Sequence, residues 1–201
     1  MGRLISSDHL IRKKYIGFAD QQNTAQQDLQ KKLLCWLLEQ ERNHTIVVNN
    51  ALEIPFPEGF LEMSIEETAG LQTVEDGEFA ALSNKEKHLL VTVGWKQSGG
   101  LFARLLSSQE LKIKMEHDIR KAMAQLDYQY TGSLNIAVGG TTADGFSYQY
   151  TAANGTEMSG DSFALKRGNT LYYIHMYSRR ALESENRGLI KEIFASARWT
   201  R

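Results

Sequence analysis

The stretch from Gly132 to Trp199 constrains the fold more than any other part of the chain. Short aromatic-rich segments with alternating apolar and polar residues follow one another there, and the dipeptides Asn154-Gly155 and Gly168-Asn169 separate them. Alternation of this kind places every second side chain on one face of a sheet, and Asn-Gly is a strong hairpin signal. The stretch therefore predicts an antiparallel meander, which an amphipathic helix over residues 180–197 closes.

Two further strands are predicted upstream of the meander. Thr45–Ile54 ends sharply at Pro55, because proline has no amide proton for a strand ladder. Lys87–Lys96 is almost continuously apolar, which is typical of a strand buried on both faces. Residues 64–86 carry few strand formers and are expected to form a loop. In the meander, a change of phase near Gly160 predicts a β-bulge.

A second amphipathic helix is predicted from Ser107 to about Asp127. Ser107 and Glu110 form a candidate capping box at its start, and apolar residues then recur at three- and four-residue spacing. Two such helices and a sheet with apolar residues on both faces require three layers. The sequence therefore predicts an α+β fold, a three-layer α/β/α sandwich around an antiparallel sheet, over residues 45–201.

Residues 1–44 are expected to form a helical extension outside that domain. From about Thr24 to Arg42, apolar residues that include Trp36 and Leu37 recur at helical spacing. One interpretation is a helix that packs on the core of the domain. The other is a docking or dimerisation helix, because an exposed apolar stripe of that width needs a partner. The second interpretation predicts a homo-oligomer held through this helix.

Three segments carry a resemblance to a known family. They are Leu52–Phe60 with its Ile-Pro-Phe-Pro-Glu-Gly-Phe sequence, the turn and strand Gly168–Ile174, and the closing Ile193–Trp199. Over roughly residues 45–200 the chain resembles the PsbP-like (DcrB-like) proteins, α/β/α sandwiches built around an antiparallel sheet. The resemblance implies a mostly non-catalytic scaffold. Similar proteins include photosystem accessory subunits, a nuclear-transport factor that binds the GTPase Ran, bacterial lipoproteins, and bacterial chaperones that shield apolar helices of secreted effectors.

Composition and spacing argue against several other classes of protein. The net charge of −1 disfavours a nucleic-acid-binding surface, and no apolar run approaches the roughly 20 residues of a membrane span. The single cysteine, Cys35, allows no internal disulfide. The histidines are scattered without metal-ligand spacing, so no metal or cofactor is expected. Because no secretory signal is visible, we expect a cytoplasmic protein, or an extracytoplasmic one if the native N-terminus was trimmed.

The expected activity is binding to another protein, for which three surfaces are candidates. They are an aromatic strand face in the meander, an acidic segment between Arg42 and Lys85 that contains no lysine or arginine, and the apolar face of the N-terminal helix. The candidate contact residues are Tyr148, Tyr173, His175, Tyr177, Glu66, Glu67, Trp36 and Leu37.

Two alternatives stay open at the level of sequence. The first is a chaperone for apolar helices of secreted effectors, which needs a groove lined by the aromatic residues of the sheet. The second is an enzyme whose site is assembled from residues that are distant in sequence, with His175, His117, Asp144 and Asp161 as its polar candidates. A pocket that gathers at least two of these four side chains would favour the enzyme.

Overall fold

The computed structural model describes residues 43–68, 77–99 and 107–200 of the chain. By its internal contacts the chain divides into two units, residues 1–43 and residues 44–201, and apart from Asn43 the sheets and helices described here lie in the second. The predicted N-terminal helix, with Trp36 and Leu37, lies outside the described residues.

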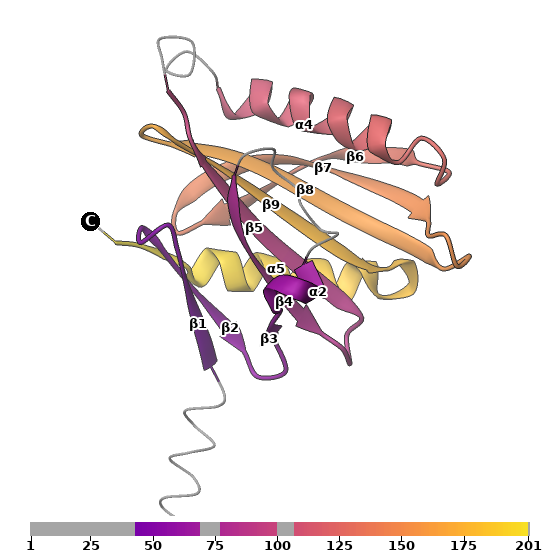
Figure 1. Ribbon diagram of the computed structural model, residues 1–201, viewed down its shortest axis with the longest axis horizontal. Helices are drawn as coiled ribbons and strands as arrows, with labels where there is room; N and C mark the ends of the chain where they lie inside the picture. The colour runs from indigo at the N-terminus through magenta and orange to yellow at the C-terminus, as the bar shows by residue number, and fades with distance from the viewer. Residues whose placement is uncertain (1–42, 69–76, 100–106, 201) are drawn as a thin grey trace, which may run out of the picture. The chain divides into compact units, whose positions relative to one another are not determined.

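A seven-stranded antiparallel sheet forms the centre of the second unit (Figure 1). Its four C-terminal strands follow one another as hairpins, as the alternating sequence predicts, and Gly155 and Gly168 turn the chain with φ values of 79° and 58°. From one edge to the other the strands are β3 (Leu61–Glu62), β4 (Glu78–Asn84), β5 (Leu89–Gln97), β9 (Thr170–Arg179), β8 (Glu157–Arg167), β7 (Thr141–Thr151) and β6 (Gln129–Val138).

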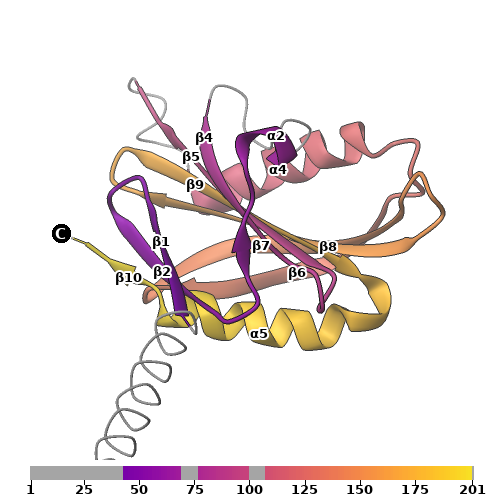
Figure 2. The same ribbon diagram turned by 60° about the horizontal axis from the view of Figure 1, so that its bottom comes forward.

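One helix packs on each face of this sheet (Figures 1 and 2). Helix α4 (Ser108–Ala122) lies over β7 and β8, and helix α5 (Glu183–Ser196) lies on the opposite face. The adjacent residues Phe163 and Ala164 of β8 demonstrate this arrangement. Phe163 belongs to the apolar cluster that contains α5, and Ala164 belongs to the cluster that contains α4.

The start of α4 has the predicted capping box. The side-chain oxygen of Ser107 accepts a hydrogen bond from the backbone N–H of Glu110 at 3.2 Å, and the Glu110 carboxylate accepts one from the backbone N–H of Ser107 at 2.7 Å. These two bonds satisfy donors that the first turn of a helix leaves without intrahelical partners. The Glu110 carboxylate also accepts a hydrogen bond from the Ser107 hydroxyl at 2.9 Å. The backbone and side-chain bonds from Ser107 lower the pKa of this carboxyl, because both favour its ionised form.

A three-stranded sheet lies beside α5 (Figure 2). The strand predicted over Thr45–Ile54 is two strands here, because Asn49 and Asn50 adopt positive φ values of 53° and 50° and turn the chain between them. The predicted end at Pro55 is wrong, since the second strand continues to Pro57. Asparagine tolerates this left-handed region better than most residues, so two in succession make a tight turn. The strands of this sheet are β1 (Asn43–Val48), β2 (Leu52–Pro57) and β10 (Arg198–Trp199).

Residues 64–86, expected as a loop, contain the short helix α2 (Ile65–Thr68) and strand β4. Strand β4 is rich in alanine, serine and glutamate, which have weak strand preference. It forms because β5 supplies a complete ladder, from Glu78 opposite Trp95 to Asn84 opposite Leu89. The tertiary partner decides the structure of this segment.

The bulge predicted near Gly160 is absent, since β8 pairs in continuous register with both neighbours. A Cβ atom at this position would overlap the ring of Tyr148, so the glycine is needed for a close approach of that ring. The register shift occurs instead in β6, between Tyr130 and Gly132.

Candidate functional site

The structure brings the four predicted aromatic-face residues to one face of the sheet, beneath or beside α4. Tyr148 on β7 and His175 on β9 are buried, whereas Tyr173 and Tyr177 on β9 are half-buried. Tyr148 packs in the same cluster as Leu111 of α4. The inner part of this face is therefore core, and only its margin reaches the surface.

The centre of that face is polar but held neutral. His175 Nδ1 lies 2.8 Å from Ser162 Oγ, and burial lowers the pKa of His175 to about 4. Burial also raises the pKa of the Tyr177 hydroxyl to about 12 and that of Tyr148 well above its ordinary value. None of these groups changes protonation near neutral pH in the folded protein.

The predicted acidic residues lie elsewhere. Glu67 is exposed on α2, where its carboxylate accepts a hydrogen bond from the backbone N–H of Ser64 at 2.8 Å. This contact caps the short helix, and the backbone N–H of Glu67 donates in turn to Ser64 Oγ at 3.3 Å. The side chain of Glu66 lies outside the described part of the molecule.

A row of aromatic rings connects the buried face to the surface. The ring centroids of Tyr148 and Phe146 are 5.7 Å apart, and those of Phe146 and Tyr130 are 6.3 Å apart. Tyr128 stacks on Tyr148 at 5.4 Å. Tyr130, at the start of edge strand β6, is 43% exposed, so the row of rings ends at the surface.

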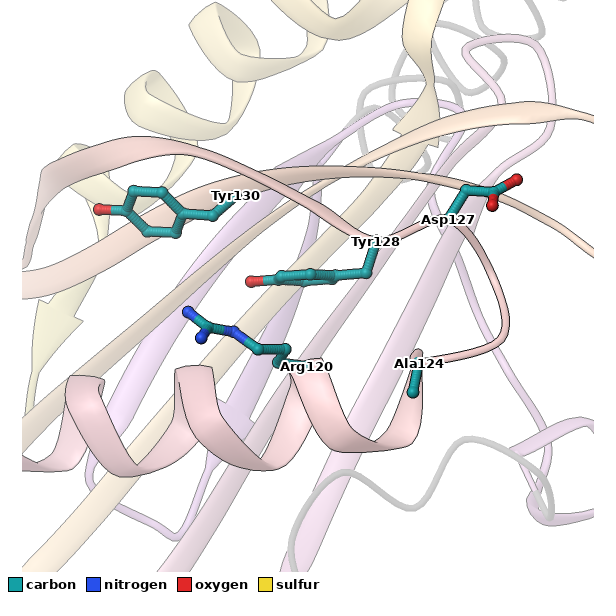
Figure 3. Close-up of a pocket in the computed structure, with 5 residues that line it drawn as sticks. All are labelled: Arg120, Ala124, Asp127, Tyr128 and Tyr130. Atoms are coloured by element: carbon teal, nitrogen blue, oxygen red, sulfur yellow. The ribbon is translucent and has the colours of Figure 1, made fainter.

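An open hollow of about 440 Å³ lies between the end of α4 and the start of β6 (Figure 3). In Figure 3 the Arg120 side chain extends from α4 toward the hydroxyl end of Tyr128. Arg120 also forms an ion pair with Glu116, one turn earlier in the helix. Burial raises the pKa of Tyr128, so its hydroxyl remains a neutral hydrogen-bonding group. The hollow is lined by Arg120, Ala124, Asp127, Tyr128 and Tyr130.

Sequence reasoning missed this hollow, although one signal was present. Tyr128 and Tyr130 alternate immediately after a predicted helix, which places two tyrosines on the same face at the start of a strand. The sequence pattern places Arg120 on the solvent-exposed surface of the predicted helix. Only the return of the chain from α4 into β6 brings the three side chains together.

Strand β6, at the sheet edge, carries an unusual polar contact beside Tyr130. The ammonium group of Lys112 on α4 donates to Ser133 Oγ at 2.8 Å, and the Tyr130 hydroxyl lies 2.8 Å from the same oxygen. Lys112 is only 7% exposed. Among the described residues no carboxylate pairs with it, although Lys114 on the same helix has Asp118 at 2.7 Å.

Comparison with known proteins finds likeness in structure alone. No protein-family model matches the chain, and no curated protein matches its sequence. The solution structure of cyanobacterial PsbP (CyanoP) from Synechocystis superposes with a TM-score of 0.59 at 7% identity, covering 80% of this chain and 94% of that one. The chain has the PsbP-like fold. The predicted resemblance is thereby confirmed as a fold.

Two other solved structures are similar in fold to this chain. A protein from Bacteroides thetaiotaomicron superposes with a TM-score of 0.53 at 12% identity, and the match covers 80% of this chain and 49% of that one. The Ran-binding protein Mog1p of Saccharomyces cerevisiae gives a TM-score of 0.49 at 12% identity, over 77% of this chain and 94% of that one.

Three of the four polar residues of the enzyme hypothesis lie on strands of the large sheet, and the fourth lies on helix α4. Asp161 of β8 points toward α5, where Arg187 binds both its carboxylate oxygens at 2.7 Å, whereas His175 faces α4. His117 is exposed on α4, and Asp144 is half-buried on β7. The described side chains contain no group of three histidine, cysteine, aspartate or glutamate residues arranged to hold a metal ion.

The groove required by the chaperone hypothesis would lie where α4 now packs. Leu111 and Met115 of this helix share an apolar cluster with Phe146 and Tyr148 of the sheet. An apolar helix from another protein would reach these rings only if α4 moved away.

Within the described ranges, no helix is both long enough and apolar enough to cross a membrane.

Proposed function

We propose that this protein is a non-catalytic binding module for another protein, and that its contact surface is β6 together with the hollow at the end of α4. The observation that carries the proposal is Tyr130, which is 43% exposed and belongs both to the sheet edge and to the hollow. Tyrosine and arginine are the residue types that most often dominate protein interfaces, and this hollow places Arg120 beside two tyrosines.

The geometry of the hollow supports a side chain of the partner as its occupant. A volume of about 440 Å³ accommodates a large apolar or aromatic side chain, while the open mouth suits a group that enters from a neighbouring chain. Tyr128 and Tyr130 offer ring faces, and the guanidinium of Arg120 offers hydrogen-bond donors. The predicted N-terminal helix with Trp36 and Leu37 is a second proposed contact surface. Pairing of two copies through this helix would give the proposed homo-oligomer.

Site-specific photo-crosslinking tests this proposal. A benzophenone amino acid replaces Tyr130 in the full chain, and in a matched control it replaces Leu61 on β3. Leu61 is 62% exposed at the opposite edge of the same sheet. We expect a discrete crosslinked protein from cells that make the chain natively, formed from position 130 and not from position 61. Equal crosslinking at both positions, or none at position 130, would contradict the proposal.

A loss-of-contact variant completes the test. Tyr130→Ser removes the exposed ring while keeping a hydroxyl, and we expect it to reduce recovery of the crosslinked protein when the probe is placed at Asp127 on the rim of the hollow. Because a single hot-spot residue contributes about 2 kcal/mol or more, the expected loss is at least about thirtyfold in affinity. Unchanged recovery would show that the ring makes no contact with the partner.

A further inference from the structure

Strand β6 is the long free edge of the large sheet. Its ten residues, Gln129–Val138, include no charged residue and no proline, two of the features that protect an edge from pairing. The register shift of this strand, between Tyr130 and Gly132, lies near its start and leaves residues 132–138 in continuous register with β7. Among the described strands it pairs with β7 alone. Outside that ladder, the described backbone hydrogen bonds include none from residues 129–138, and only the carbonyl of Val138 has a side-chain donor, Trp199 Nε1 at 3.0 Å.

Side chains flank this edge on both faces of the sheet. On the α5 face, Leu134 of β6 and Leu189 of α5 are both half-buried and pack against the main core. On the α4 face lie Tyr130, with the hollow beside it, and Ser133. A strand laid along β6 would therefore meet apolar side chains on one face and the hollow with its polar neighbour on the other.

Lys112 gives the α4 side of this edge a charge preference. Its ammonium group has three donors, and the described contacts use one of them, on Ser133. Lys112 is 7% exposed as a residue, and among the described residues no carboxylate pairs with its ammonium group, so a carboxylate placed beside it would form a charge-assisted hydrogen bond. Asp118 and Glu116 already serve Lys114 and Arg120. A carboxylate supplied by another chain is the group that fits here.

We propose that an extended segment of the partner protein pairs with β6 as an eighth strand and places an aspartate or glutamate side chain against Lys112 and Ser133. This inference rests on the proposed function and specifies its mode of recognition. Backbone hydrogen bonds to β6 supply affinity, and pockets for alternate side chains supply specificity. Residues two apart in a strand share a face, so the partner carries an acidic residue and a large apolar residue separated by one position, the apolar one in the hollow.

The test uses the full ¹⁵N-labelled chain and two pairs of synthetic decapeptides. Each peptide alternates threonine and valine and carries Phe-Thr-Glu or, in the reverse order, Glu-Thr-Phe at its centre; its mate has glutamine in place of glutamate. Two orders are needed because the added strand can run in either direction. We expect amide shifts concentrated in residues 131–137. For one order we also expect half-saturation with the glutamate peptide at a concentration about fivefold or more below that of its glutamine mate.

Variants then assign the charge effect. Lys112→Gln is expected to abolish the difference between the glutamate and glutamine peptides, and Lys121→Gln, an exposed lysine of the same helix region, is expected to preserve it. The peptide comparison on the unaltered protein keeps the inference testable even if Lys112→Gln does not fold. Equal half-saturation by both peptides of each pair, shifts centred outside β6, or no shift at millimolar peptide would overturn it.

Two further outcomes separate this inference from other occupants and from the proposed function. Concentration-dependent dimers in sedimentation, with broadened β6 amides in the free protein, would show that a second copy covers the edge and would overturn the inference. If a partner is crosslinked at position 130 but the glutamate peptides bind no better than their glutamine mates, the proposed function is supported. The inference of an added strand that carries a carboxylate is then wrong. If no partner is crosslinked at position 130 either, both proposals are wrong.

Discussion

The ion pair between Arg187 of α5 and Asp161 of β8 provides the sharpest test of how the helix is held on the sheet. The guanidinium donates to both oxygens of Asp161 at 2.7 Å, and Asp161 is 1% exposed. Arg187→Met leaves that carboxylate with Ser147 Oγ, at 2.7 Å, as its described partner. Removing one member of a buried ion pair leaves the other charge without its partner, which costs about 3–5 kcal/mol. Since the Arg187 side chain is itself 28% exposed, we expect about 3 kcal/mol.

Urea unfolding followed by circular dichroism measures this loss, and thermal unfolding should show a decrease in Tm of about 6–12 °C. The matched control is Lys87→Met, which removes the exposed ion pair of Lys87 with Glu185 on the same helix and should cost less than about 1 kcal/mol. Adding Asp161→Asn to Arg187→Met should recover a large part of the loss, because no buried charge remains. A loss below about 1 kcal/mol for Arg187→Met, or simple additivity in the double variant, would refute this reasoning.

Two further predictions concern the stability of the protein: one compares two glycine substitutions, and the other concerns the buried histidine beneath α4. Gly160→Ala should lower the free energy of unfolding by about 1–3 kcal/mol, because its Cβ overlaps the ring of Tyr148, whereas Gly188→Ala, in an open stretch of α5, should raise it by about 0.5–1 kcal/mol in urea titrations. Because burial holds the pKa of His175 at about 4, against about 6.5 when unfolded, the unfolded chain binds more protons between these values. Stability should therefore fall as the pH is lowered from about 6.5 to 4, by up to about 3 kcal/mol, and His175→Gln should flatten this dependence; an unchanged slope in the variant would show that another group is responsible.

The meander and its faces could be predicted from sequence because alternation is a local property. Tyr172, Ile174 and Met176 face the α5 side of β9, and the intervening residues face α4, as the pattern predicts. Strand β4 could not be predicted, since its two alanines, its glutamate, its serine and its asparagine have weak strand preference and form a strand only through pairing with β5.

The candidate site depended on relations that a single segment does not contain. Sequence placed Tyr148 and His175 on one face correctly, but whether a helix covers that face is decided by where α4 packs. The hollow needs the turn that carries the chain from Arg120 to Tyr130. The uncompensated charge of Lys112 is likewise visible only when the ion pairs of its neighbours are known.

The two edges of the large sheet differ in a way that limits how copies of this chain can stack. Strand β6 offers ten residues without a charge. At the other end, β3 covers only Leu82 and Ser83 of β4, so the described edge consists of the two residues of β3 and the start of β4, and it carries the carboxylates of Glu62 and Glu78. Fibrils grow without limit when each molecule presents two complementary edges, one for each neighbour. Among the described strands of this sheet, β6 is the long edge without a charged residue, so pairing of two copies through β6 leaves no second edge of the same kind. The molecule can therefore expose an uncharged edge strand that is able to pair with another strand, with little risk of indefinite sheet growth.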